Sequence, residues 1–586
     1  MAPRLQRPRC HHRRRRPLGA AHGKPGSAAP LELSAATLAG ERHALRPRRR
    51  LMAALVAGLA AGLVGLGWHV LSAAGWTVWE ALILACLAVN APWLGLAAAT
   101  GLVGIAIRLR ARDPLAAVLP ALRQPGWQDA AITARTVIAV CVRLEDMAAV
   151  LPPLGALLAE LRRLPAESGR FRLAILSDTP DGAAALKEAE AVARLAARFP
   201  PGAVHYRRRA CNTGYKAGNL MDFLDHGAAE EFLLLLDADS AMSAAAVRRL
   251  VRLMQADRRL AILQPTIRGH GDATRFARAF GLGQRHGMRI WATGQAWWQG
   301  PEGAFWGHNA LIRIAPFRAN ARLPTLPGGE AILSHDLVEA ALLHAAGWSV
   351  RVLPDDVGSF ERHPPDLLAC LDRDIRWARG NLQYRHLLQR PDLGRLGRLQ
   401  MLQAILHYAL TPFWFALLPL AAINAATGGG EGTPRAALLL LLASGFLMLN
   451  LPKLAGHAEA LLRPGPRLRR LGPILHEVAA ALAADAIMAA ERTALILTSA
   501  MRPSAGWASQ QRDGRRLPLA RTAWRLRVSM GAGLASLALL AAGGPFPVIV
   551  ALPIWLPLLL AVPIVMRMAE APSPAEPSPL GGVPGP

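Results

Sequence analysis

The sequence contains few cysteines, and they form no framework. Five cysteines, at positions 10, 86, 141, 211 and 370, are scattered over 586 residues, and no two form a Cys-x-x-Cys pair. Because the cysteines are not regularly spaced, the sequence excludes a small domain held together by disulfides. The pattern fits a compartment in which thiols stay reduced.

Acidic residues are also scarce, since 40 Asp and Glu face 67 Lys and Arg, for a net charge of +27. Such a charge could indicate nucleic-acid binding, but the arginine-rich segments mostly flank apolar runs. These segments are 13–16, 48–50, 108–112, 463–470 and 515–527. The positive-inside rule and anionic lipid headgroups explain that placement. We therefore expect membrane lipids and anionic substrates as partners, and no nucleic acid.

Apolar residues make up 52% of the chain and are gathered into long runs. Several runs approach the roughly 20 residues that cross a bilayer as a helix. They are Leu51–Leu71, Ala81–Ile107, Leu402–Ala426, Ala436–Leu451, Val528–Ala542 and Phe546–Met566. A mostly polar region separates the first two runs from the rest, and 586 residues exceed what one core holds. We therefore predict an integral membrane protein with a large soluble insert.

The charges at the ends of the runs predict the topology. Residues 1–50 and 568–586 should be disordered tails, and no cleavable signal peptide is expected. Crossings in 51–112, 399–455 and 528–567, two in each, leave residues 133–390 and 456–527 on the cytoplasmic side. The apolar segment 473–502 carries charges between basic flanks, so it crosses twice or lies at the interface. We expect the interfacial helix and six crossings.

The insert, residues 133–390, alternates short apolar runs with helical periodicity. This pattern predicts βαβ units and an α/β, Rossmann-like domain with a mostly parallel sheet. The predicted strands are Val137–Val142, Phe171–Leu176, Val204–Tyr206 and Phe232–Leu236. Ligands of such sheets bind beyond the carboxyl ends of the strands.

Two aspartates, Asp237 and Asp239, directly follow the buried strand Phe232–Leu236. Two carboxylates at this edge suit Mg²⁺ or Mn²⁺ bridging a diphosphate. An isolated Asp-x-Asp is more often a solvated turn. The neighbouring strand ends favour the binding site, because they carry further charged groups.

Glu145 and Asp178 follow the first two strands and suit ribose hydroxyls and uracil N–H groups. Asp178 could instead cap the next helix. Lys216 enters a helix between Gly214 and Gly218, which suits a phosphate at a helix start or an ordinary loop-to-helix transition. Together these groups outline a nucleotide site.

Asp336 opens a predicted helix that ends near Ala346. It could be a helix-terminal charge or a general base for a hydroxyl. Arg376 beside Trp377 could form a cation–π pair, or a diphosphate clamp next to a sugar-stacking indole. His308 and Asn309 belong to the segment Trp306-Gly-His-Asn309.

In this order the segments resemble those of processive, membrane-embedded glycosyltransferases of family two, and most closely the glucans biosynthesis glucosyltransferase H family. The segments that carry the resemblance are Leu176–Thr179, Asn212–Asn219, Trp306–Asn309, Leu333–Leu342, Arg373–Trp377, Gly380–Gln383 and Trp507–Asp513. The first strand departs from the family, since it ends Cys141-Val-Arg-Leu-Glu145.

The resemblance implies a GT-A fold and an inverting, processive transfer of glucose from UDP-glucose to a growing β-glucan, coupled to export across the bacterial inner membrane. It implies acyl carrier protein and a periplasmic glucan-processing protein as partners. It further implies these roles: Asp336 as base; Asp237 and Asp239 as metal ligands; Glu145, Asp178, Lys216, Arg376 and Trp377 for the donor; and His308, Asn309 and Trp377 for the acceptor.

Two alternatives remain. One is another processive synthase, cellulose-like or hyaluronan-like, with a different donor or linkage. The other is a non-enzymatic transporter or scaffold, which the intact set of Asp237, Asp239, Asp336, Arg376 and Trp377 disfavours.

Overall fold

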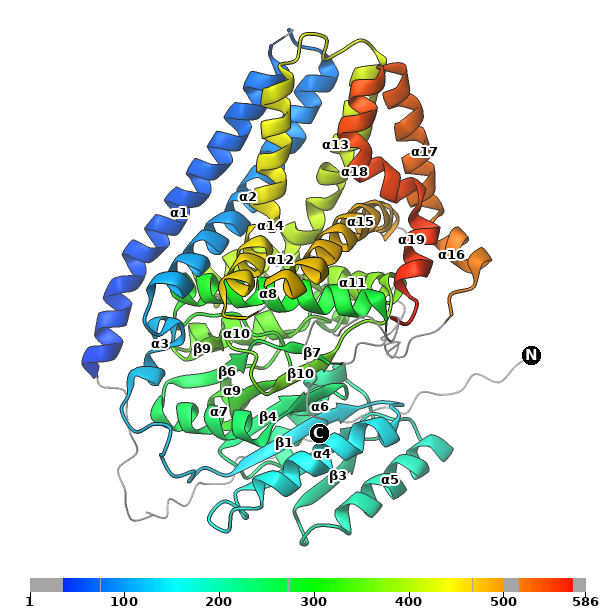
Figure 1. The fold of residues 1–586 in the computed structure, drawn as a ribbon. Coiled ribbons are helices and arrows are strands. Elements are labelled where there is room, and N and C mark those ends of the chain that lie inside the picture. Colours follow the sequence, from blue (N-terminus) through cyan, green and yellow to red (C-terminus); the bar gives the residue numbers. More distant parts are fainter. Residues whose placement is uncertain (1–34, 74, 271–273, 466, 500–515, 573–586) are drawn as a thin grey trace.

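A computed structural model of the chain describes residues 35–73, 75–270, 274–465, 467–499 and 516–572. The molecule has two parts, an α/β domain and a bundle of long helices stacked on it (Figure 1). Residues far apart in the sequence form the bundle, because the α/β domain is inserted between its second helix and the rest.

The main sheet has seven strands in the order β3-β2-β1-β4-β8-β6-β9. Their bounds are β1 Thr136–Val142, β2 Phe171–Ser177, β3 Val204–Arg208, β4 Phe232–Leu236, β6 Leu260–Pro265, β8 Ala310–Arg313 and β9 Ser349–Leu353. Only β8 runs antiparallel to its neighbours. The predicted α/β fold with a mostly parallel sheet is confirmed.

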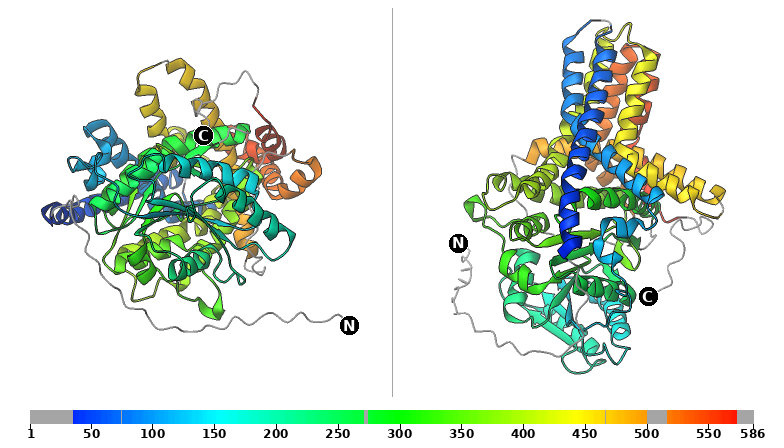
Figure 2. Two further views of the ribbon diagram at one scale, coloured as in Figure 1. Left: turned by 90° about the horizontal axis from the view of Figure 1, so that it is seen from below. Right: turned by 90° about the vertical axis from the view of Figure 1, so that its left-hand side faces the viewer.

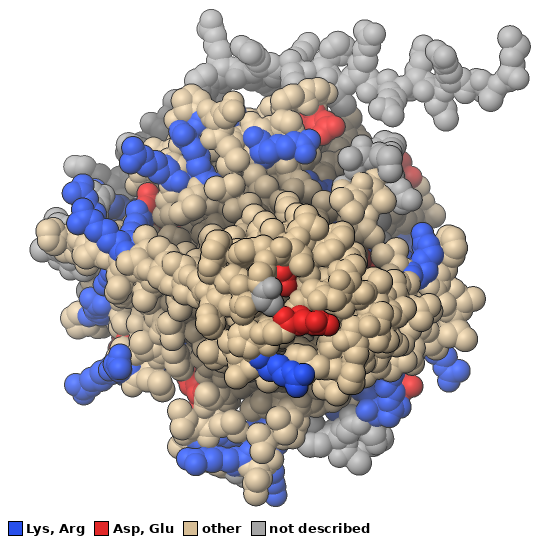
Figure 3. All heavy atoms as spheres, turned by 90° about the horizontal axis from the view of Figure 1, so that it is seen from above, with Lys and Arg blue, Asp and Glu red and all other residues tan. Residues whose placement is uncertain are grey.

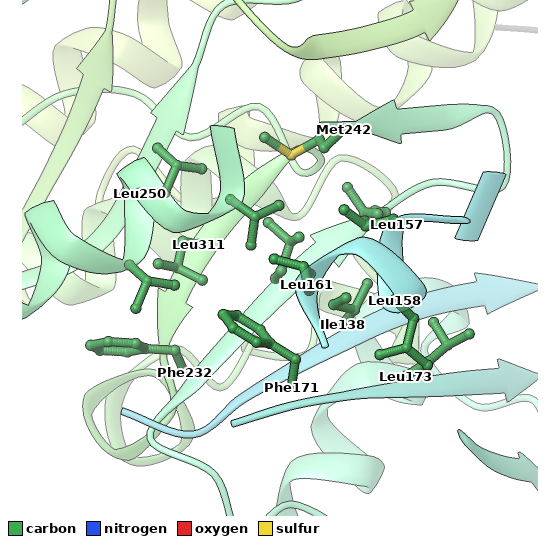
Figure 4. Close-up of a cluster of buried hydrophobic side chains, with 14 of the residues drawn as sticks. Ile138, Leu157, Leu158, Leu161, Phe171, Leu173, Phe232, Met242, Leu250 and Leu311 are labelled. Carbon is green, nitrogen blue, oxygen red and sulfur yellow. The ribbon is translucent and has the colours of Figure 1, made fainter. Parts of the chain in front are cut away.

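Helices cover both faces of this sheet. One face carries α4 Met147–Leu161, α5 Ala183–Ala196 and α7 Ala244–Ala256; the other carries α6 Tyr215–His226, α9 Ile314–Asn320 and α10 Asp336–Ala345. Along β1, Ile138 and Val140 enter the first core while Val137 and Ala139 enter the second. Figure 4 shows Ile138 packed with leucines of α4. Burial on both faces explains why these strands are continuous apolar runs.

The register aligns the carboxyl ends of three neighbouring strands. Val142 of β1 lies opposite Ser177 of β2, and Val140 lies opposite Leu236 of β4. The residues that follow β1, β2 and β4 therefore emerge at one edge of the sheet. A second, small sheet in the order β5-β10-β7 lies beyond β4; its strands are β5 Ser240–Met242, β7 Arg268–His270 and β10 Ser359–Arg362.

The bundle and its base contain the apolar helices. They are α1 Ala35–Leu71, α2 Val78–Arg110, α12 Arg395–Ala409, α13 Thr411–Ala426, α14 Arg435–Leu462, α15 Arg467–Ser499, α16 Leu519–Arg525, α17 Arg527–Ala542, α18 Pro545–Leu559 and α19 Ala561–Met568. Seen from above, the bundle end is mostly neither acidic nor basic, and the Lys and Arg side chains lie toward the rim (Figure 3).

Among the described residues, five helices are long and apolar enough to cross a membrane, or up to seven if each bent pair counts as one span. The bends are 64° between α16 and α17 and 66° between α18 and α19. By length and composition α15 is one of the five, yet it lies across the base of the bundle beside α8 Arg275–Gln299 (Figures 1 and 2). Six crossings with an interfacial 473–502 stay a prediction.

The N-terminal boundary needs a correction. Residues 1–50 were expected to be disordered, but α1 already begins at Ala35. Glu41 forms a buried ion pair with Arg351 of β9, and Arg49 pairs with Glu302 just after α8. Composition alone predicted disorder because these partners lie about 250 to 310 residues away along the chain.

Candidate active site

Asp237, at the end of β4, forms an ion pair with Lys216 in the first turn of α6. The same ammonium donates to the carbonyl oxygen of Gly307 at 2.7 Å. Burial lowers the pKa of Lys216, but Asp237 and the neighbouring Cys141 and Asp336 together raise it above its ordinary value. Lys216 is therefore a permanent cation that joins the sheet edge to the loop 306–309.

Gly307 joins this pair to Asp336. A Cβ atom placed on Gly307 would lie 3.5 Å from Cβ of Asp336, and the φ angle of Gly307 is +83°. Asp237, Lys216 and Gly307 are thus in contact in this order, and Asp336 lies beside Gly307. The structure brings together the end of β4 and the start of α10, which the sequence keeps about a hundred residues apart.

Asp336 is the first residue of α10, and no side chain caps that helix. Burial raises the pKa of Asp336, while the neighbouring His335 lowers it; the net direction is upward. A carboxylate with a raised pKa binds a proton more readily than a solvated one. The position thus suits proton abstraction from a hydroxyl.

The loop before Asp336 is held by the end of α11 Leu367–Leu382. The Tyr384 hydroxyl donates to the Ser334 carbonyl at 2.8 Å, and the Gln383 side chain accepts from the Leu333 amide at 2.9 Å. A Cβ atom on Gly380 would lie 2.2 Å from Oγ of Ser334. The segment Gly380–Gln383 therefore positions Asp336.

Asp178, after β2, is buried in a bidentate ion pair with Arg209. It does not cap a helix, because the N-cap of α5 is Gly182. Arg209 also donates to the carbonyls of Thr213 and Tyr215 at 2.9 and 2.8 Å. Asp178 thus orders the loop that delivers Lys216.

Glu145 is half-buried in the loop after β1, at the same edge. That loop is fastened to the end of β2, since the Leu144 amide donates to Oγ1 of Thr179 at 2.9 Å. Leu144 takes a φ of +56°. Glu145, Asp178 and Asp237 therefore follow three adjacent strands, and their roles toward a nucleoside stay predictions.

Asn309 and His308 face β10. Asn309 is fully buried and donates to Oγ of Ser359 at 3.0 Å and to the Phe360 carbonyl at 3.1 Å. His308 places Nε2 3.7 Å from Oε2 of Glu361. The amide of Asn309 is thus committed to holding the loop 306–309 against β10.

Glu361 is a site residue that the sequence analysis missed. In the β5-β10 pair it lies opposite Ser240, the residue after Asp239. Burial raises the pKa of Glu361, His308 lowers it, and Asp239 raises it again. The segment Ser359–Arg362 is short and polar, so only the strand pairing reveals that its carboxylate reaches this edge.

Trp377 and Arg376 lie on α11. Trp377 is 42% exposed, and Arg373 stacks on its ring, with 4.6 Å from the guanidinium carbon to the ring centroid. Arg376 is half-buried, and burial lowers its pKa while Asp372 raises it. The exposed indole face suits a sugar ring, and both residues remain predicted ligands.

No group of three or more His, Cys, Asp or Glu in the described part of the chain is arranged to hold a metal ion. Asp237 nevertheless forms an ion pair with a positively charged side chain, the Lys216 ammonium. With Asp239 it offers only carboxylate oxygens, the ligands that Mg²⁺ and Mn²⁺ prefer. This pair of carboxylates would fit a divalent cation of that kind.

A cavity of about 620 Å³ lies between the bundle and α8. Three tryptophans line it, Trp93 of α2, Trp291 of α8 and Trp414 of α13, together with polar side chains such as Asn90 and Arg492. Arg492 of α15 forms a bidentate ion pair with Asp374 of α11, three residues before Trp377. The helix that carries Trp377 therefore borders the cavity.

Comparison with known proteins identifies the family. The model for "glycosyl transferase family group 2" matches residues 232–450. The glucans biosynthesis glucosyltransferase H of Caulobacter vibrioides is 34% identical over 89% of this chain and 82% of its own. That of Rhodopseudomonas palustris strain TIE-1 is 32% identical over 97% and 81%.

Among solved structures, a mannosyltransferase from Pyrobaculum calidifontis in complex with GDP-Man and Mn²⁺ aligns with a TM-score of 0.39 and 15% identity, covering 62% of this chain and 99% of its own. A likeness of that size supports no conclusion about function. The curated relatives do support a conclusion about family and activity, because their similarity extends over most of both chains. The protein is a glycosyltransferase and belongs to the glucans biosynthesis glucosyltransferase H family.

Proposed function

We propose that this protein transfers glucose from UDP-glucose to a growing β-glucan with inversion at the anomeric carbon. The observation that carries the proposal is the contact series Asp237, Lys216, Gly307 and Asp336. It sets groups that suit a diphosphate beside a carboxylate that suits a general base. Membership of a family named for glucan synthesis supports glucose as the transferred sugar.

On the donor side, Asp237 and Asp239 would hold Mg²⁺ or Mn²⁺, which neutralises the leaving diphosphate when bound. Lys216 would exchange its Asp237 partner for a phosphate oxygen, with Arg376 as a further cation. A neutralised diphosphate leaves without a proton donor, so no second carboxylic acid of the glycosidase kind is needed. Glu145 and Asp178 would contact or order the uridine side.

On the acceptor side, Asp336 would take the proton from the attacking hydroxyl, and in-line attack gives a β-linkage. Trp377 would stack on the terminal sugar of the acceptor, with His308 and Asn309 shaping the same wall. Because the pKa of Asp336 is raised, its carboxylate is a better base than a solvated aspartate.

The proposal extends to location. The ends of α1 and α2 that lie nearer the α/β domain carry arginines (Figure 1): Arg48 of α1 donates to the Trp297 carbonyl of α8, and Arg108 of α2 pairs with Glu459 of α14. By the positive-inside rule, these ends and the α/β domain face the cytoplasm of a bacterial inner membrane. A polar glucan made there must cross the bilayer, and the cavity lined by tryptophans supports a path through the bundle, with synthesis processive and coupled to export. Acyl carrier protein and a periplasmic glucan-processing protein remain expected partners.

The test supplies radiolabelled UDP-glucose to membranes containing the wild type or the D336N variant. We expect labelled β-glucan from the wild type and a loss of roughly 10²- to 10⁴-fold in rate for D336N. The D225N variant, which breaks an ion pair with Arg322 elsewhere in the domain, should retain activity. Linkage analysis and a panel of other sugar nucleotides distinguish a cellulose-like or hyaluronan-like enzyme.

Export has its own experiment. Inside-out vesicles receive labelled UDP-glucose, and a glucanase added outside digests only glucan that has stayed on the catalytic side. Protected glucan supports export coupling. Complete digestion would limit the proposal to synthesis.

A further inference from the structure

The loop 306–309 takes part in two pairs of an acidic and a basic side chain. Gly307 accepts from Lys216, which pairs with Asp237. The next residue, His308, places its ring nitrogen 3.7 Å from Glu361. This loop thus brings together two groups that can donate to phosphate oxygens. They are Lys216, which is paired with Asp237, and His308, which lies beside Glu361.

Hydrogen bonds of the neighbouring residues fix the backbone on both sides of the His308–Glu361 pair. Asn309, fully buried, bonds to Ser359 and Phe360, the two residues before Glu361. On its other side, β10 pairs with β5, so that Glu361 lies opposite Ser240. The amide of Arg362 also donates to the carbonyl of Asp239 at 3.4 Å. The backbone therefore fixes Glu361 between the Asp-x-Asp turn and His308.

A mostly buried carboxylate is costly unless it is paired, and Glu361, which is 15% exposed, lies near His308 and Arg373 but also near the like charges of Asp239 and Asp237. A glutamate used only for packing gains nothing from two like charges nearby. Its position is explained if it orients the imidazole of His308, whose side chain is 18% exposed. Nothing in the catalytic scheme above assigns Glu361 a role.

We propose that Glu361 is a positioning residue of the transfer site, which holds His308 so that its imidazole donates to the diphosphate of the nucleotide sugar. The diphosphate then meets two donors on or beside one loop, Lys216 and His308, so His308 serves the donor rather than the acceptor. This inference rests on the proposed function, since it takes a nucleoside diphosphate as the ligand.

The experiment measures the Kd of UDP with Mn²⁺ for the purified full-length protein and for E361Q, H308Q and the double variant. We expect each single variant to raise Kd about tenfold, as loss of a hydrogen bond to a charged group does. If Glu361 acts through His308, the double variant is no weaker than the weaker single variant. For UDP-glucose, E361Q should raise KM more than it lowers kcat.

The control is E167Q, which neutralises another mostly buried carboxylate, paired with Arg248 away from this edge, and should leave the Kd unchanged. If E361Q does not fold, E361D with H308Q gives the same cycle. Unchanged UDP binding in the Glu361 variant, or single effects that multiply in the double variant, would overturn the inference. Failure of the wild type to bind UDP or use UDP-glucose would instead overturn the proposed function.

Discussion

The two halves of the α/β domain build their shares of the site in different ways. In the first half, Glu145, Asp178 and Asp237 directly follow β1, β2 and β4, so parallel pairing alone brings them to one edge. In the second half, the loop 306–309 precedes the antiparallel strand β8, Asp336 begins the helix α10, and Glu361 lies on the short strand β10. Their positions depend on side-chain contacts between segments distant in sequence.

The difference has a functional meaning. A nucleotide and its diphosphate have a constant shape, which a regular sheet edge can match. On the proposed function, the second half adds the base Asp336 and, through His308 and Glu361, a further contact to the diphosphate. We therefore expect substitutions in the first half to abolish donor use. In the second half, substitutions around Asp336 should lower the rate, and those at His308 and Glu361 should weaken UDP binding moderately.

The largest effect should come from the carboxylates of the first half. D237N and D239N remove the charge expected to hold the divalent cation, and each should lower glucosyl transfer by about a hundredfold or more. Transfer is measured with labelled UDP-glucose over a range of Mn²⁺ concentrations. Equal activity of either variant and D225N would contradict the assignment.

Substitution of Lys216 tests the junction between the two halves, because Lys216 contacts Asp237 of the first half and Gly307 of the second. K216M should weaken UDP binding roughly 10- to 100-fold, since a charged partner of the diphosphate is lost. K187M, on the exposed surface of α5, is the matched control. If K216M changed only kcat and left the Kd of UDP unaltered, Lys216 would not bind the diphosphate.

Gly380 tests the second half without removing a charge. In G380A the new Cβ would lie 2.2 Å from Oγ and 2.8 Å from the amide nitrogen of Ser334, which must shift the loop before Asp336. We expect kcat to fall about tenfold while the Kd of UDP stays the same. G394A, where a Cβ would meet nothing within 4 Å, should behave as wild type in both measurements.

The smallest effect concerns pH. Because the pKa of Asp336 is raised by burial, the acid limb of kcat/KM should lie above the range of a solvated aspartate, and activity should fall as pH drops through it. His335 lowers that pKa, so H335Q should move the acid limb to higher pH. H226N, at an exposed histidine of α6, should leave the limb in place. A shift to lower pH in H335Q would contradict Asp336 as the base.

Several contacts could not be read from the sequence, for identifiable reasons. Arg373 stacks on Trp377, a contact that the sequence analysis did not anticipate, because helix geometry places residues four apart on one face. Asp178 could equally have capped a helix, until its partner Arg209 was known, 31 residues further along. The predicted segment Trp507–Asp513 lies outside the described residues.

The sequence by itself determined the buried strands, the acidic and basic groups that follow them and the long apolar helices around the insert. Periodicity and strand ends are local properties, so they can be read along the chain. Only the tertiary structure decided that Gly307 separates Lys216 from Asp336, that Glu361 faces His308, and that α1 begins at Ala35. Each of these depends on a partner from a remote segment, and no local pattern records which remote residues will be neighbours once the chain is packed.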